Sequence, residues 1–273
     1  SDGDLSLHAW KSTRSMKTFA IANQKGGVAK STNTINLAGS LSSRGHRVAV
    51  ADLDPQGYLT NTLDLRDEYL ADKPTLFTAM NDPAGTGLEE IVVEHEEFDV
   101  IPSNIDMFRL EQELIASGRR PRLRFRQLLE DLTGYDYLIV DAPPSLGPIN
   151  DNVLLACRNL LVPVEAAETS ILAIEHLLNQ IESLEVDYDI SIQEQAVLIS
   201  NVNYPLDNEQ RSAIDWFSET FEGRCPIFEI RHRAAIKRSL SSGGSIFGAD
   251  AEETDMRNVY NELADYLETI DDD

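Results

Sequence analysis

Two scarcities in this 273-residue sequence exclude whole classes of protein. It has two cysteines, Cys157 and Cys225, too few for a disulfide-stapled scaffold in a chain of this length. It has no run approaching the roughly 18 consecutive apolar residues that a membrane-spanning helix requires. Residues 1–15 contain no apolar core of the kind found in secretory signal peptides. We therefore expect a globular cytoplasmic protein, which a hydrophobic content of 42% supports.

Lysine is also scarce. The chain has 6 Lys beside 17 Arg, and two of the lysines, Lys25 and Lys30, fall within one seven-residue motif. The 47 Asp and Glu residues outnumber the 23 Lys and Arg, which gives a formal net charge of -24. A surface rich in carboxylates and poor in lysine fits a protein kept soluble in concentrated salt, where charge repulsion is screened. We interpret the composition as a halophilic adaptation; an ordinary acidic protein is the alternative.

Positive charge is nevertheless concentrated in two segments. Residues 119–126 hold five arginines and no acidic residue. Residues 230–239 also lack acidic residues and contain Arg231, Arg233, Lys237 and Arg238. Residues 250–273, by contrast, have ten acidic residues and one arginine. The overall charge argues against nucleic-acid binding, but these local clusters permit it.

Six short apolar runs rich in β-branched residues predict β-strands. They span residues 18–23, 47–52, 98–102, 136–141, 159–164 and 196–201. Amphipathic segments such as 31–45 and 170–184 lie between them and have apolar residues at helical spacing. Alternating strands and helices predict an α/β fold with a twisted, mostly parallel sheet covered on both faces. The more polar residues 64–97 are expected to form a surface excursion.

No linker divides the chain, so we expect a single domain over residues 16–270. Met16 directly precedes the first apolar run. Residues 1–15 are therefore expected to be a mobile arm, an alternative start or a remnant of expression. Residues 271–273 are expected to form an acidic tail.

The first predicted strand runs into N-Q-K-G-G-V-A-K-S-T, residues 23–32, and then directly into a helix. This order places backbone N–H groups and a helix N-terminus around an anion. Lys30 can reach β- and γ-phosphate oxygens, and the Ser31 hydroxyl can ligate Mg²⁺. The usual G-x-x-x-x-G-K-[ST] pattern fails at Gln24 and Ala29. A glycine turn that binds nothing is the alternative, which the agreement of strand, turn, lysines, hydroxyl and helix disfavours.

Two further predicted strands end in carboxylates. The segment A-D-L-D-P-Q-G, residues 51–57, contains Asp52 and Asp54, and Y-L-I-V-D-A-P-P-S-L-G, residues 137–147, contains Asp141. Phosphoryl transfer is catalysed mostly by positioning and charge stabilisation, for which carboxylates near the γ-phosphate and its metal are suited. An aspartate after a strand is otherwise a turn or cap residue. Because α/β sheets bind ligands at the carboxyl ends of strands, three such motifs in order are more specific than any one alone.

The segment K-G-G-V-A-K-S resembles the deviant Walker A motif, K-G-G-x-x-K-[ST], of the ParA/MinD group of P-loop ATPases. The resemblance implies a P-loop NTPase fold with ATP and Mg²⁺ as cofactors. The implied nucleotide contacts are Lys25, Gly26, Gly27, Val28, Ala29, Lys30, Ser31 and Thr32. Most members have glycine where this chain has Ala29, and we expect alanine to be tolerated there in ordinary helical geometry.

The same resemblance implies roles for the other residues. Lys25 would reach the partner's phosphates in a nucleotide-sandwich homodimer, and Asp54 would orient or activate the attacking water. Asp141 would hold Mg²⁺ directly or through water, and Asp52 would support the metal and the switch geometry. Asn201 falls where relatives contact adenine, although an asparagine after a strand is commonly a turn residue.

The ParA (Soj) branch fits better than two other branches. A MinD-like chain would end in an amphipathic helix with a basic face, whereas the end of this sequence is acidic, so we expect no membrane attachment by that route. An iron-protein-like electron carrier would need suitably placed cysteines, and neither cysteine has that context. We expect both to be buried and inert.

Membership of the ParA branch implies slow ATP hydrolysis coupled to dimerisation on non-specific DNA, with a ParB-like partner, in plasmid or chromosome partitioning at the nucleoid. The implied DNA contacts are Arg231, Arg233, Lys237 and Arg238, with the 119–126 cluster less certain. The alternative is that these cations pair with the chain's own carboxylates. Two other functions stay open: an ATPase that positions a protein cargo, and a nucleotide-dependent binding module that scarcely hydrolyses ATP.

The halophilic interpretation predicts a salt-dependent melting temperature. Lowering KCl from molar to millimolar concentrations should reduce it by roughly 10 °C, because unscreened carboxylates then repel one another. Circular dichroism melts across a KCl series measure this shift. Full stability without added salt would remove the interpretation.

Overall fold

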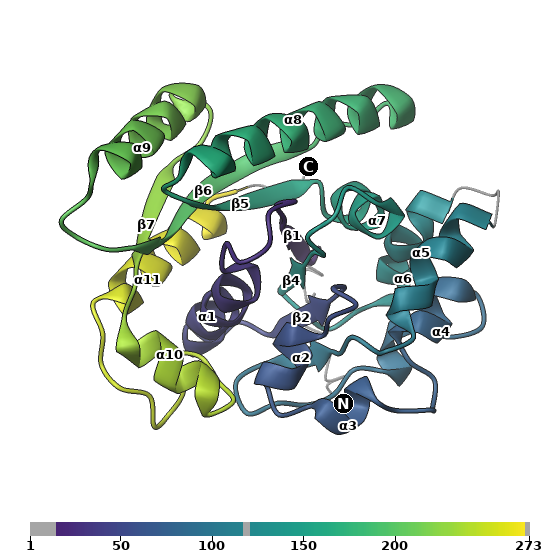
Figure 1. The fold of residues 1–273 in the computed structure, drawn as a ribbon. Coiled ribbons are helices and arrows are strands. Elements are labelled where there is room, and N and C mark those ends of the chain that lie inside the picture. The colour runs from purple at the N-terminus through teal and green to yellow at the C-terminus, as the bar shows by residue number, and fades with distance from the viewer. Residues whose placement is uncertain (1–14, 117–120, 271–273) are drawn as a thin grey trace, which may run out of the picture.

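Seven strands form one sheet in the computed structural model, which describes residues 15–116 and 121–270 (Figure 1). The strands are β1 (Lys17–Ile21), β2 (Val48–Asp52), β3 (Asp99–Ile101), β4 (Tyr137–Asp141), β5 (Asn159–Glu165), β6 (Gln193–Val202) and β7 (Ile227–Arg231). Their order across the sheet is β3-β2-β4-β1-β5-β6-β7, and every neighbouring pair is parallel. The expected parallel α/β sheet is confirmed, and β7 extends it beyond the six expected strands.

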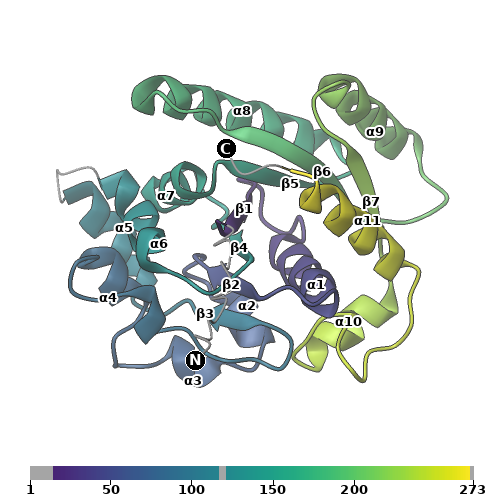
Figure 2. The same ribbon diagram turned by 180° about the vertical axis from the view of Figure 1, so that it is seen from behind.

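Helices cover both faces of this sheet (Figures 1 and 2). They are α1 (Lys30–Ser43), α2 (Tyr58–Thr62), α3 (Arg66–Tyr69), α4 (Leu76–Asn81), α5 (Met107–Ala116), α6 (Arg124–Asp131), α7 (Pro148–Cys157), α8 (Glu168–Tyr188), α9 (Asn208–Phe221), α10 (Ala234–Ser241) and α11 (Met256–Glu268), with short 3₁₀ turns at Leu88–Glu90 and Pro121–Leu123. The two amphipathic segments expected to be helical correspond to α1 and α8. Residues 1–14 and 271–273 lie outside the described residues, so the expected arm and tail stay predictions.

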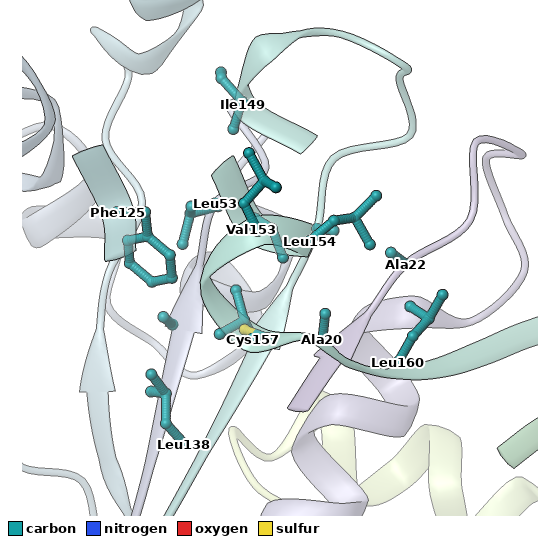
Figure 3. Close-up of a cluster of buried hydrophobic side chains, with 14 of the residues drawn as sticks. Ala20, Ala22, Leu53, Phe125, Leu138, Ile149, Val153, Leu154, Cys157 and Leu160 are labelled. Atoms are coloured by element: carbon teal, nitrogen blue, oxygen red, sulfur yellow. The ribbon is translucent and has the colours of Figure 1, made fainter. Parts of the chain in front are cut away.

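Alternate side chains of each strand enter two separate cores. In β1, Phe19 and Ile21 pack on the face covered by α1, α2, α10 and α11. Ala20 and the following Ala22 lie on the opposite face, covered by α4 to α9. Figure 3 shows both alanines beside Leu154 of α7, where their small side chains let the helix approach the sheet. Burying each large apolar side chain contributes about 1.5–3 kcal/mol, so the two cores fix the strand ends in place.

Residues 64–97 are not a surface excursion, and that expectation is wrong. They form α3, α4 and a 3₁₀ turn, and Leu76, Met80 and Leu88 are fully buried. These side chains join the core beneath α5 and α6. The polar composition misled because the apolar residues at helical spacing, Leu76, Ala79 and Met80, occupy only the short α4, which lies between Pro74 and Pro83.

Buried polar contacts tie α1 to the C-terminal helix α11. The Tyr260 hydroxyl donates to Asn33 Oδ1 at 2.7 Å, and Asn33 Nδ2 donates to Ser200 Oγ of β6 at 3.0 Å. All three side chains are buried. Buried polar groups are costly unless they are paired, so this chain of hydrogen bonds fixes α1 relative to β6 and α11.

The three central strands end at the same level. In the register of the sheet, Asp141 at the end of β4 is the partner of both Ile21 in β1 and Asp52 in β2. The loops that follow β1, β2 and β4 therefore emerge side by side. This brings the three motifs singled out in the sequence to one edge of the sheet.

Both cysteines are free thiols. Burial raises the pKa of Cys157, which lies inside the core, and it raises the pKa of the half-buried Cys225 to about 11. Both thiols are therefore protonated at neutral pH and are poor nucleophiles. In the described ranges, no helix combines the length and apolar character needed to cross a membrane.

Candidate functional site

The loop between β1 and α1 surrounds a small cavity at the carboxyl edge of the sheet. Its volume is about 310 Å³, and it is lined by Gly26, Gly27, Ala29, Lys30, Ser31, Thr32, Asp54, Tyr58, Pro144 and Asn201. Gly27 has φ +80°, and no atom lies within 4 Å of where a Cβ would stand at Gly26 or Gly27. The glycines thus leave the backbone open to a ligand, whereas Val28 is buried.

Ala29 does not have the ordinary helical geometry that we expected, and that expectation is wrong. Its backbone lies in the left-handed region, with φ 64° and ψ 33°, at the residue that precedes α1. The Ala29 carbonyl accepts a hydrogen bond from Asn33 N at 2.9 Å, which starts the helix. A Cβ in this conformation crowds the following carbonyl and costs about 1–2 kcal/mol. The position therefore favours glycine, although alanine occupies it here.

Lys30 and Ser31 line the cavity, and the buried Asp141 contacts Ser31. Lys30 Nζ donates to the carbonyl oxygen of Lys25 at 3.1 Å, and Ser31 Oγ donates to Asp141 Oδ2 at 2.5 Å. The other carboxylate oxygen, Asp141 Oδ1, is buried and has no hydrogen-bond partner among the residues that the structure describes. An unpaired buried carboxylate oxygen is costly, and a cation or a donor from a ligand would satisfy it.

The charges at this edge of the sheet are strongly perturbed. Burial lowers the pKa of Lys30, partly offset by Asp141 and Asp54. Burial raises the pKa of Asp141 well above its usual range, and the neighbouring Asp52 raises it further. Burial also raises the pKa of Asp54, and it raises that of Asp52 to about 7 against the opposing hydrogen bonds from Thr60. Lys30 thus lies near the acidic groups of Asp141 and Asp54, and Asp52 lies near Asp141, so a divalent cation would stabilise their ionised forms.

The donor set fits Mg²⁺ together with a nucleotide better than it fits Mg²⁺ alone. In the described part of the chain, no group of three or more His, Cys, Asp and Glu side chains could hold a metal ion. Mg²⁺ in nucleotide sites is commonly bound by one or two protein oxygens plus phosphate oxygens and water. The Ser31 hydroxyl and the unpaired Asp141 Oδ1 supply protein oxygens of that kind.

Asp52 is held by residues that the sequence analysis did not single out. Its Oδ2 accepts hydrogen bonds from Thr60 N at 2.9 Å and Thr60 Oγ1 at 2.6 Å, and its Oδ1 accepts from Asp54 N at 3.2 Å. Ser103 N donates to Thr60 Oγ1 at 2.9 Å, and Ser103 Oγ donates to the Asp54 carbonyl at 2.7 Å. Ser103 follows β3, and this position at the end of a strand was the one sequence feature that could have indicated its role. Nothing in the sequence around Thr60 indicates its contact with Asp52.

Lys25 does not line the cavity and is bound to its own chain. Its Nζ lies 2.9 Å from Thr169 Oγ1, 3.3 Å from Ser170 Oγ and 3.4 Å from Glu165 Oε2. Glu165 Oε1 also accepts a hydrogen bond from Asn201 Nδ2 at 3.3 Å. Glu165, which the sequence analysis missed, thus connects the loop lysine to the residue expected near adenine.

The four cations expected to contact DNA divide into two pairs. Arg233 and Arg238 form ion pairs with Asp255 and Glu252. Their partners are carboxylates of the segment that precedes α11. The other two, Arg231 and Lys237, are exposed, and the Arg231 guanidinium lies 4.8 Å from the centre of the Tyr204 ring.

Two of the three described arginines in the 119–126 cluster make contacts within the protein. Arg122 pairs with the buried Asp151 at 2.8 Å, and Arg124 Nη1 donates to the Met80 carbonyl at 2.9 Å. Arg126 is exposed. Residues 119 and 120 lie outside the described residues.

Comparison with protein families and relatives gives consistent matches. A family model described as an AAA domain matches residues 16–194. The sporulation initiation inhibitor protein Soj of Bacillus subtilis is 32% identical over 185 residues, which cover 67% of this chain and 72% of Soj. The chromosome-partitioning ATPase Soj of Thermus thermophilus is 33% identical, with 68% and 69% covered. The match spans 58% of the length of two uncharacterized Mycobacterium tuberculosis relatives, which are 31% identical.

Solved structures share the fold over nearly the whole chain. The Cyanothece McdA complex with ATP has a TM-score of 0.82 and 24% identity, and the alignment covers 94% of this chain and 98% of McdA. Cobyrinic acid a,c-diamide synthase from Mycobacterium smegmatis, bound to an ATP analogue and magnesium, has a TM-score of 0.77 at 24% identity, with 92% and 94% covered. At these identities, the likeness concerns the fold.

Replacing Ala29 by glycine should stabilise the protein. The strain of the left-handed alanine is removed at a smaller entropic cost in the unfolded chain, for a net gain of about 0.5–1 kcal/mol. Urea unfolding measures the change. Ala156→Gly, within α7, is the matched control and should destabilise by about 1 kcal/mol. A loss of stability in both variants would contradict the strain at Ala29.

Removing the Thr60 hydroxyl should destabilise the protein by about 1–3 kcal/mol, because Asp52 loses a hydrogen bond and Ser103 N loses its acceptor in a buried place. Thr60→Val tests this by urea unfolding, with Thr60→Ser as the control that keeps the hydroxyl. Equal stability of the two variants would show that the buried network contributes little.

Proposed function

The chain belongs to the AAA-domain family of ParA/Soj-type P-loop ATPases, and from this membership we propose that it hydrolyses ATP to ADP and phosphate in a DNA-partition cycle. The observation that carries the proposal is the convergence of Lys30, Ser31 and Asp141 beneath an open glycine loop, with Asp141 Oδ1 buried and unpaired. An anionic, metal-binding ligand satisfies both the loop N–H groups and this oxygen.

The loop residues bind and orient the triphosphate. Backbone N–H groups of the loop and the N-terminus of α1 surround the phosphates, and Lys30 offsets their negative charge. Ser31 and Asp141 would hold Mg²⁺, which would supply positive charge to offset that of the phosphate oxygens. Because Lys30 is 7% exposed, its ammonium acts where water screens it weakly.

Asp54 is proposed to orient the attacking water. It lines the cavity, and its Oδ1 accepts a hydrogen bond from Gln56 N at 3.0 Å. Burial raises the pKa of Asp54, which makes it a better proton acceptor than an exposed aspartate. We propose that Asp52 holds the backbone around Asp54 in place. Its Oδ1 accepts a hydrogen bond from Asp54 N, and its Oδ2 accepts one from Thr60 N of α2.

ATP-dependent dimerisation is proposed to move Lys25 to the partner's phosphates. In the single chain, Glu165, Thr169 and Ser170 bind the Lys25 ammonium. The Glu165 contact is long, at 3.4 Å, and the other two partners are neutral hydroxyl groups, so the multiply charged phosphates of a second nucleotide-bound subunit would draw the lysine away.

The DNA part of the cycle is proposed to use Arg231, Arg233, Lys237 and Arg238, with hydrolysis stimulated by a ParB-like partner on the cargo at the nucleoid. The open cations Arg231 and Lys237 support phosphate contact. The pairing of Arg233 and Arg238 with carboxylates favours a second candidate, an ATPase that positions a protein cargo. Recovery of DNA or of a protein assembly with the ATP-bound protein separates the two.

The proposed hydrolysis predicts different effects for two substitutions. Asp54→Ala should keep ATP binding and dimerisation but reduce turnover by about a hundredfold or more, because the water loses its orienting carboxylate. Lys30→Ala should lose nucleotide affinity. Phosphate release and binding of a fluorescent ATP analogue measure the two effects.

Asp72→Ala is the matched control, since Asp72 is exposed in the loop before α4. It should behave like the parent protein. Hydrolysis at the parental rate by Asp54→Ala would show that another group orients the water.

A further inference from the structure

The segment between α10 and α11, residues 249–255, places carboxylates on the cations expected to bind DNA. Arg233 Nε and Nη2 donate to the two carboxylate oxygens of Asp255 at 2.8 Å and 2.7 Å. Arg238 Nε donates to Glu252 Oε2 at 2.8 Å, and its Nη2 contacts the same oxygen. Both guanidinium groups therefore use their forked donors within the chain.

The other two cations of this surface lack such partners. Arg231 and Lys237 are exposed, and no carboxylate oxygen lies within 4 Å of either among the described residues. The predicted DNA surface is thus half open and half covered by the protein's own acidic groups.

The covering carboxylates present the chemistry of a phosphate group. Guanidinium binds carboxylate and phosphate through the same paired N–H···O geometry. Hydrogen bonds from Arg233 lower the pKa of Asp255, so this carboxylate is ionised at neutral pH. A DNA phosphate and the Asp255 carboxylate therefore require the same donors.

We propose that Asp255 and Glu252 compete with DNA phosphates for Arg233 and Arg238, so that DNA binds this surface by displacing the 249–255 segment's carboxylates. The inference rests on the proposed DNA binding, and it adds that the protein's own carboxylates compete for the same arginines. Arg231 and Lys237 make the first phosphate contacts because no carboxylate has to be displaced from them.

The backbone of the segment is held independently of these two carboxylates. Arg257 Nε donates to the Ile246 carbonyl at 2.7 Å, and its Nη2 donates to the Ala251 carbonyl at 3.2 Å. Arg257 also pairs with Glu253. Amide substitutions at the two competing positions therefore leave the segment anchored.

The competition has a signature in the salt dependence of binding. Each phosphate that is neutralised releases counterions from DNA, which makes the affinity fall as salt rises. Each displaced carboxylate takes up a cation from solution, which opposes that release. The parent protein should therefore show a shallower salt dependence than variants that lack the carboxylates.

The test compares Asp255→Asn, Glu252→Gln and the double variant with Glu253→Gln, which makes the same one-unit change in charge as each single variant, on the same segment. Fluorescence anisotropy of a random-sequence duplex, with ATP-bound protein across a KCl series, gives affinity and slope. We expect the double variant to bind roughly three- to tenfold more tightly at low salt, with a slope steeper by about one to two units. Glu253→Gln should change both much less.

Lys237→Ala identifies the surface, because it should weaken binding by all of these proteins. If Asp255→Asn and Glu252→Gln change the DNA affinity and its salt dependence no more than Glu253→Gln does, while the parent binds DNA, the competition is overturned and the DNA function stands. If neither the parent nor any variant retains DNA while all bind ATP, the proposed DNA function and the competition both fall.

Discussion

Three carboxylates and one ammonium are held largely out of water at the ends of β1, β2 and β4, and the rest of the site depends on that constraint. Asp52 and Asp141 are buried, Lys30 nearly so, and Asp54 lies at the cavity. Such a cluster is stable only where hydrogen bonds and counter-charges offset the lost hydration. Asp52 has that support from the protein, whereas one oxygen of Asp141 does not. This difference indicates that the Asp52 carboxylate has a structural role, whereas the Asp141 carboxylate is suited to bind a ligand.

The acidic composition also governs how the cations are used. Arg44, Arg224 and Arg257 pair with carboxylates on the surface, as do Arg233 and Arg238. Exposed pairs of this kind contribute little to stability and weaken further in salt. Their greater effect is on the recognition of anionic ligands, because such a ligand must displace the protein's own carboxylate from the arginine.

The sequence was a good guide where a feature depends on local pattern. Periodicity located α1, α8 and six of the seven strands, and the order of motifs placed Ser31 beside Asp141. It failed where geometry depends on distant contacts. The left-handed backbone at Ala29 follows from how the loop enters α1, and the partners of Lys25 come from residues about 140 positions away. Thr60 gave no local signal because its role exists only once α2 packs beside β3.

The contact between Tyr260 and Asn33 links the two ends of the described chain. Asn33 lies in the first turn of α1, directly after the loop that surrounds the cavity, and α11 follows every other described element. During synthesis, Asn33 Nδ2 can pair with Ser200 once β6 forms, but Asn33 Oδ1 must wait for Tyr260 of α11 to supply its donor. A ribosome that stalls before residue 256 would release a chain with a poorly seated loop, so truncated products would compete weakly with finished ones for nucleotide.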